Sequence, residues 1–338
     1  MFSPSRAASL NLKEPRIYQE IRNFPAQFLA SWKIVRDHPK LTPWAPTPGA
    51  TVYYAAMGGS SLPADLVNDG LGAGPRLEIV RDYRLPAAAG PQDLCIASSY
   101  SGNTEETLAA LDDALARGCR AISLSHGGQL EAKAAAAGIP HVAIPECIQP
   151  RCASGYFFAS LVGIFYRLSL IPNPEALLDR LAKHLSGVQD ACEARGKALA
   201  EALRDRVPIV YGPAEFAGAA RIWKIKFNEN AKIQSFSNVF PELNHNEMVG
   251  FTRLLMKPAL IFLESRFMHP RVKRRMDVME EILGREIPIH RLACGGESPL
   301  FEMFEGLAVA DYASYHLAQA YGIDPAPVEM VEAFKKKL

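Results

Sequence analysis

Hydroxyl side chains crowd around one glycine in residues 98–107, which read Ser-Ser-Tyr-Ser-Gly-Asn-Thr-Glu-Glu-Thr. The segment follows an apolar run typical of a strand and leads into a helical pattern, so Ser99, Ser101 and Thr104 would lie at a helix N-terminus. Unpaired backbone N–H groups and the positive end of the helix dipole favour an anion there. A capping box is the simpler interpretation, but one hydroxyl would be enough for a cap. Three hydroxyls and a glycine predict a phosphate-binding loop.

A second turn, Gly58-Gly59-Ser60, also follows a run typical of a strand. Two glycines permit positive φ and a close approach of the backbone to a ligand. The turn lacks the Walker lysine and the spacing of a dinucleotide fingerprint, so neither ATP nor NAD is indicated. By itself it fits a substrate contact and an ordinary strand-to-helix connection equally well.

Short β-rich runs alternate with helical runs on both sides of one long helical stretch. We expect strands at residues 51–57, 93–97, 119–124 and 141–144, and again at 207–211, 259–263 and 287–292. Strands that alternate with single helices form βαβ units and a parallel sheet. The sequence therefore predicts an α/β fold of two similar, doubly wound (flavodoxin-like) parallel-sheet subdomains, with ligands beyond the carboxyl ends of the strands.

Four segments follow from this pattern. We expect an N-terminal helical segment at 1–50 and a first subdomain at 51–173, which carries the phosphate loop. A helical linker at 174–206 and a second subdomain at 207–338, closed by a helix from residue 328, complete the chain.

The bulk composition narrows the function classes. With 338 residues and a net charge of +1, the chain offers no general affinity for nucleic acid, and the basic clusters at 273–275 and 335–337 are typical of solvated helix faces. The six cysteines form no C-x-x-C pair, which argues against a zinc site and favours the reducing cytoplasm. No apolar run approaches the roughly 18–20 residues that span a bilayer, so we expect neither membrane insertion nor an export signal.

Taken together, Gly58-Gly59-Ser60 and the segment from Ser99 to Glu106 resemble the sugar isomerase (SIS) domain. From about residue 20 to its end, the chain resembles the bifunctional phosphoglucose/phosphomannose isomerase family. Further matches are Gln149-Pro150-Arg151 with Gly155-Tyr156, Asn228-Glu229-Asn230-Ala231-Lys232, and Glu242-Leu243-Asn244-His245-Asn246-Glu247.

The resemblance implies an enzyme that interconverts glucose 6-phosphate, and possibly mannose 6-phosphate, with fructose 6-phosphate through an enediol. Glu229 would be the base that moves the proton between C1 and C2, because a weak carbon acid needs a fixed base beside it. His245 would assist ring opening and would reach the pocket of a neighbouring subunit, which makes the enzyme a homodimer. A capping or surface carboxylate is the alternative for Glu229.

Arg151 and a lysine of the last helix complete the implied site. A rigid, permanently charged guanidinium suits a developing enediolate, although Arg151 could also form an ion pair at a helix start. Lys335 is the best match for the lysine that helps to open the ring, and its neighbours Lys336 and Lys337 leave the assignment open. Neither a metal nor an organic cofactor is expected, since no Asp/Glu/His cluster is apparent.

One departure and two alternatives remain. The family often has Pro-Thr-Pro-Val before the last helix, whereas this chain has Pro325-Ala326-Pro327-Val328, which puts activity on mannose 6-phosphate in doubt. A non-catalytic phosphosugar sensor could keep the phosphate loop without Glu229 and His245. An SIS enzyme for another phosphosugar is the third interpretation; the amide-hydrolysing domain of glucosamine-6-phosphate synthase would need a cysteine where Phe2 stands.

Overall fold

The computed structural model describes residues 16–72 and 74–338, so Phe2 lies outside the described residues. The chain forms two compact units. The N-terminal unit comprises Asn23–Lys183, and the described residues of the C-terminal unit are Arg16–Arg22 and His184–Leu338. No helix within the described residues is long and apolar enough to cross a membrane.

The segments expected at 1–50 and 174–206 are not separate from these two units. Helix α1 (Arg16–Arg22) contributes to the C-terminal unit, where it packs on helix α11 (Pro299–Ala320). Helix α2 (Phe24–Val35) packs on helix α6 (Ser154–Arg167) of the N-terminal unit. The long helix α7 (Glu175–Ala202) is continuous across the boundary after Lys183. The N-terminal segment is divided because its two helices bury their apolar side chains in different cores.

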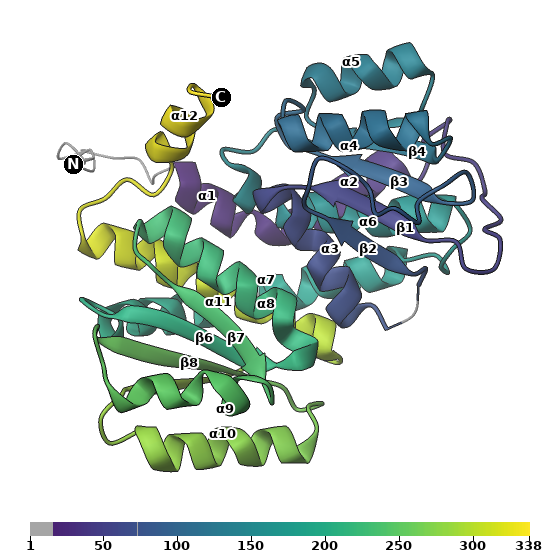
Figure 1. The fold of residues 1–338 in the computed structure, drawn as a ribbon. Helices are drawn as coiled ribbons and strands as arrows, with labels where there is room; N and C mark the ends of the chain where they lie inside the picture. The colour runs from purple at the N-terminus through teal and green to yellow at the C-terminus, as the bar shows by residue number, and fades with distance from the viewer. Residues whose placement is uncertain (1–15, 73) are drawn as a thin grey trace. The chain divides into compact units, whose positions relative to one another are not determined.

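A five-stranded parallel sheet forms the centre of the N-terminal unit, in the order β2-β1-β3-β4-β5. Helices α4 and α5 cover one face, and α3 and α6 lie on the other (Figure 1). The strands are β1 (Val52–Ala56), β2 (Leu77–Val80), β3 (Leu94–Ser98), β4 (Arg120–Ser125) and β5 (His141–Ala143), and the helices are α3 (Gly58–Gly70), α4 (Glu105–Ala116) and α5 (Gly128–Ala137).

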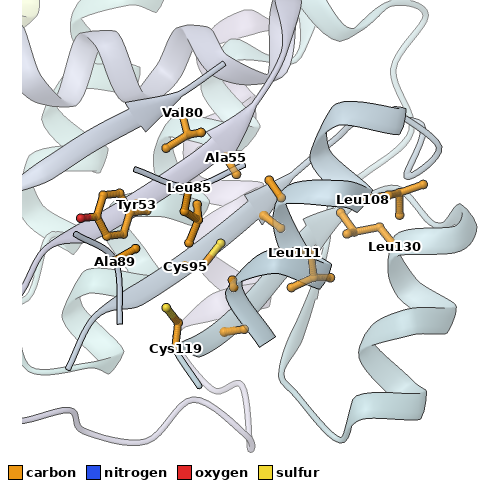
Figure 2. Close-up of a cluster of buried hydrophobic side chains, with 14 residues drawn as sticks. Tyr53, Ala55, Val80, Leu85, Ala89, Cys95, Leu108, Leu111, Cys119 and Leu130 are labelled. Carbon is orange, nitrogen blue, oxygen red and sulfur yellow. The ribbon is translucent and has the colours of Figure 1, made fainter. Parts of the chain in front are cut away.

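The alternation of side chains along the central strands builds the core beneath α4. Figure 2 shows this cluster, with Tyr53 from β1, Cys95 from β3, and Leu108 and Leu111 from α4. Leu111 and Cys95 are fully buried, and burial of a leucine side chain contributes about 1.5–3 kcal/mol. Leu108 and Leu111 lie on the buried face of α4 and therefore fix this helix, and the loop before it, on the sheet.

The C-terminal unit has a four-stranded parallel sheet in the order β7-β6-β8-β9. Tyr211 and Phe262 of its central strands pack with Met276 and Met279 of helix α10. The strands are β6 (Val207–Pro213), β7 (Phe236–Phe240), β8 (Pro258–Glu264) and β9 (Ile289–Ala293), and the other helices are α8 (Ala217–Lys226), α9 (Leu243–Asn246), α10 (Pro270–Leu283) and α12 (Glu329–Lys335).

The expected α/β fold with two similar parallel sheets is confirmed, because the first four strands of the N-terminal sheet and the four strands of the C-terminal sheet have the same order. Strands β2 and β7 were not predicted. Both are edge strands whose residues are mostly half-exposed, so they lack the apolar run that marks β1 or β8. As a result, the predicted phosphate loop follows the third strand of the chain, not the second.

Candidate active site

The loop between β3 and α4 is closed by its own hydroxyl groups. Ser99 is buried, and its Oγ lies 2.8 Å from Thr104 Oγ1 and accepts a hydrogen bond from the Gly102 N–H. Thr104 is the N-cap residue of α4, yet its side chain makes no capping hydrogen bond. The exposed Ser101 accepts from the Asn103 N–H through its Oγ. The geometry therefore differs from the simple capping box that was the alternative interpretation of these hydroxyls.

Gly102 allows this loop to form. Its φ is +67°, and a Cβ atom there would lie 1.7 Å from the carbonyl oxygen of Gly127. Any side chain would therefore strain the backbone and collide with the neighbouring loop.

The second predicted turn lies against the phosphate loop. Ser60 Oγ accepts a hydrogen bond of 2.9 Å from the backbone N–H of Tyr100, which joins the start of α3 to the loop. A Cβ atom at Gly59 would lie 2.8 Å from the backbone nitrogen of Arg151, so only glycine permits this approach. Gly58 is exposed and has a φ of +48°. Three predicted segments, at 58–60, 99–104 and 151, thus gather in the N-terminal unit.

Arg151 lies in a 3₁₀ turn, Pro150–Cys152, and its side chain is fully buried. The turn is braced by Gln27 of α2, whose Nε2 donates to the carbonyl of Cys152 at 2.7 Å. The Oε1 of Gln27 accepts from the Gly155 N–H at 3.0 Å, at the start of α6. Gln27 was not predicted as a site residue; its signal in the sequence is a polar side chain among mostly apolar ones on the buried face of α2, where Ser31 is the other polar residue.

Glu229 lies in a π turn, Phe227–Ala231, that directly follows α8. Such turns are rare and frequently mark functional positions. A buried ion pair of 2.6 Å between Lys226 and Asp311 anchors the chain before the turn, and the Asn230 side chain donates to Ser314 Oγ within it. The partly buried Glu229 is therefore mounted on a stretch of backbone held from α11.

Lys232 ends this turn and was not assigned a role from the sequence. Its φ is +57°, and its ammonium donates to the carbonyl oxygens of Glu229, Pro325 and Pro327. It thus joins the turn of Glu229 to the segment that precedes α12. The residue belongs to the motif 228–232, so the motif was a signal for it, but Pro325 and Pro327 lie more than 90 residues away in the sequence.

The remaining predicted residues lie on separate elements of the C-terminal unit. His245 is exposed on the short helix α9, while Glu247 beside it accepts from the Tyr211 hydroxyl and from the Asn238 side chain. Burial and this carboxylate raise the pKa of Tyr211, so the hydroxyl stays protonated and donates. Lys335 is exposed on α12 and pairs with Glu332 at 3.1 Å. Within the described residues, no group of three or more His, Cys, Asp or Glu side chains could hold a metal ion.

Comparison with known proteins identifies the family. The profile described as "Bacterial phospho-glucose isomerase C-terminal SIS domain" matches residues 192–338. The chain is 34% identical over 304 residues to the bifunctional phosphoglucose/phosphomannose isomerase of Caldicellulosiruptor bescii, which covers 85% of this chain and 89% of that one. It is 31% identical over 290 residues to the enzyme of the same name from Thermoplasma acidophilum, which covers 86% and 90% of the two chains.

A solved structure supports the fold alone. The tagatose-6-phosphate ketose/aldose isomerase of Escherichia coli superimposes with a TM-score of 0.69 at 16% identity, over 96% of this chain and 97% of that one. The sequence relatives carry the family assignment, since their identity extends over most of both chains. This chain belongs to the bifunctional phosphoglucose/phosphomannose isomerase family of SIS-domain enzymes.

Proposed function

We propose that the protein catalyses the reversible isomerisation of glucose 6-phosphate to fructose 6-phosphate through an enediol, with Glu229 as the base. One observation carries this proposal: the uncapped hydroxyl loop at the start of α4 lies together with the Gly59 turn and the turn of Arg151. A hydroxyl-rich loop at a helix N-terminus suits the phosphate of a sugar phosphate. The names of the curated relatives support the same substrate class.

The chemistry assigns one task to each residue. His245 exchanges a proton with the ring oxygen, and the ring opens with the help of Lys335. Glu229 then removes the proton at C2 and the electron pair moves to O1, which leaves an enediolate whose negative charge Arg151 stabilises. The proton of the C2 hydroxyl passes to O1, and the protonated Glu229 returns its proton to C1 as C2 becomes the ketone.

Mannose 6-phosphate is the second proposed substrate. It differs from glucose 6-phosphate at C2, and that centre becomes planar in the enediol, so one intermediate serves both sugars. The relatives are named for both activities, which favours both here. The alanine at position 326, where the family often has threonine, leads us to expect a lower kcat/KM for mannose 6-phosphate than for glucose 6-phosphate.

We also propose a homodimer in which His245 completes the site of the partner, in the reducing cytoplasm where the cysteines stay free. The segment after His245 exposes large apolar side chains to solvent in the single chain. Val249 is 73% exposed and Leu255 is 88% exposed. Contiguous exposed apolar residues are typical of an interface between proteins.

The base is tested by Glu229→Gln in a coupled assay with both sugar phosphates. We expect kcat to fall about 1,000-fold, within the range for loss of a general base, while glucose 6-phosphate still raises the melting temperature. Glu215→Gln, at an exposed glutamate of the same unit, is the matched control and should keep full activity. Normal turnover by Glu229→Gln would exclude this residue as the base. A wild-type protein that binds the sugar without turnover would instead be a sensor.

The shared site is tested by complementation. Glu229→Gln and His245→Ala proteins should each be inactive, but unfolding and refolding them together should restore activity. In the mixed dimer, one of the two sites has both an intact Glu229 and an intact His245. If mixing restores nothing although the mixed dimer forms, His245 does not act across the interface.

A further inference from the structure

Tyr100 lies inside the phosphate loop, between Ser99 and Ser101, but its side chain reaches out of the loop. Its hydroxyl donates to the backbone carbonyl of Cys147 at 2.6 Å and accepts from the backbone N–H of the same residue. One side chain therefore satisfies both backbone groups of Cys147. Cys147 is buried and stands four residues before Arg151.

The ring and backbone of Tyr100 are held as well. The ring stacks on His126 at 5.6 Å with an interplanar angle of 9°, and it meets the edge of Phe157 of α6 at 6.4 Å. The Tyr100 N–H donates to Ser60 Oγ, and its carbonyl accepts from the His126 N–H. These contacts leave the hydroxyl a single orientation, toward the segment that leads to Arg151.

We propose that Tyr100 is a positioning residue that couples the phosphate loop to Arg151. A phosphate that orders residues 99–104 would order Cys147 through the Tyr100 hydroxyl and, through the short segment 148–150, the guanidinium of Arg151. Binding of the substrate's phosphate would thereby position Arg151, which stabilises the enediolate formed from the same substrate. The catalytic part of this inference rests on the proposed isomerase activity; the mechanical link between the two segments does not.

The first test is Tyr100→Phe, which removes the hydroxyl and keeps the ring stack. We expect kcat for glucose 6-phosphate to fall about 10-fold, while the inhibition constant for inorganic phosphate changes less than twofold, because the phosphate loop keeps its own hydrogen bonds. Tyr166→Phe in α6, the same deletion elsewhere in the unit, should change neither value. A rise in the phosphate constant with unchanged kcat would overturn the proposal.

A double-mutant cycle separates positioning from general damage. In an Arg151→Lys background, Tyr100→Phe should cost less than about twofold in kcat, since residues that act as a unit are not additive. If the two effects multiply, Tyr100 does not act through Arg151.

A measurement without turnover tests the link itself. Cys147 labelling by iodoacetamide, followed by peptide mapping, should be slowed by inorganic phosphate in the wild type. In Tyr100→Phe, labelling should be faster and the protection by phosphate lost. Cys95 is fully buried, with a pKa raised by burial, and serves as the internal reference. Unchanged Cys147 labelling, or an equal rise at Cys95, would overturn the proposal. If the wild type had no isomerase activity but showed the labelling pattern, only the proposed function would fail.

Discussion

Two corresponding elements of the units, each a strand followed by a loop and a helix, differ in what their loops contain. In the N-terminal unit, β3 leads through Ser99 to α4, and in the C-terminal unit, β8 leads through Ser265 to α10. Strand β3 lies beside β1, and β8 lies beside β6. Helix α4 buries apolar side chains against β1 and β3, and α10 buries them against β6 and β8. The difference lies in what occupies the loop.

The loop after β8 is already filled by the protein. The buried carboxylate of Glu302 accepts from Ser265 Oγ at 2.6 Å, from the Arg266 N–H and from the Arg266 guanidinium. His269 caps α10 by accepting from the Arg271 N–H, and Pro270 lacks a backbone N–H altogether. After β3, by contrast, the side chain of Thr104 makes no capping hydrogen bond. One copy of the loop thus holds an internal anion, whereas the other is the loop at which we propose that the phosphate binds. On this proposal the chain would bind one phosphosugar through one of its two similar sheets.

The largest expected effect comes from giving the first loop the charge that the second already has. Ser101→Asp places a carboxylate beside the proposed phosphate, so like-charge repulsion should raise the KM for glucose 6-phosphate at least about 100-fold, or about 2.7 kcal/mol. Steady-state kinetics measures it. Ser101→Ala, the uncharged control, should raise KM only severalfold with little change in kcat. An Asp variant that resembles the Ala variant would move the phosphate away from residues 99–104.

The reverse change concerns the second loop. Glu302→Gln removes the internal negative charge while Arg266 keeps its guanidinium, so we expect the free energy of unfolding to fall by about 1–3 kcal/mol. Urea unfolding measures this loss, and the KM for glucose 6-phosphate should stay within twofold of the wild type. Glu286→Gln, at an exposed glutamate of the same unit, should leave both unchanged. If Glu302→Gln raised KM strongly, the second loop would belong to the binding site.

A third change concerns the turn that holds Glu229 in the C-terminal unit. Lys232→Met removes the ammonium that joins the carbonyl of Glu229 to those of Pro325 and Pro327. We expect kcat to fall about 10-fold, since a misplaced base transfers the proton less efficiently, with KM nearly unchanged. Lys232→Arg should recover part of the loss. A KM effect without a kcat effect would show that Lys232 serves binding.

The smallest expected effect is the pH dependence of stability, which involves one histidine from each sheet. Burial lowers the pKa of His141 in β5 and of His290 in β9 below the ordinary value of 6.5. Below about pH 6.5 these histidines bind more protons in the unfolded chain than in the folded protein. The free energy of unfolding therefore falls as the pH falls. We expect a loss of about 1 kcal/mol between pH 7 and pH 5.5, measured by urea unfolding, and a smaller loss in His141→Gln and His290→Gln. A stability that rises toward pH 5.5 would contradict these pKa directions.

The sequence could predict those parts whose cause is local. Buried central strands such as β1, β3 and β8 are continuous apolar runs, and the hydroxyls around Gly102 are too many for a cap. Strands β2 and β7, which lie at sheet edges, were not predicted. The pairings that brace the site could not be predicted, because Gln27 and Glu302, and Lys232 through Pro325 and Pro327, bind partners more than 30 residues away in the chain.

By itself, then, the sequence determined the α/β class, the family and the residue types that an isomerase needs. Those depend on short-range patterns and on motifs within a few residues. The tertiary structure decided what fills the loop after β8, because the carboxylate of Glu302 that accepts from Ser265 lies 37 residues further along the chain. It also decided how Arg151 and Glu229 are held, since burial and hydrogen bonds between distant segments exist only once the sheets have formed.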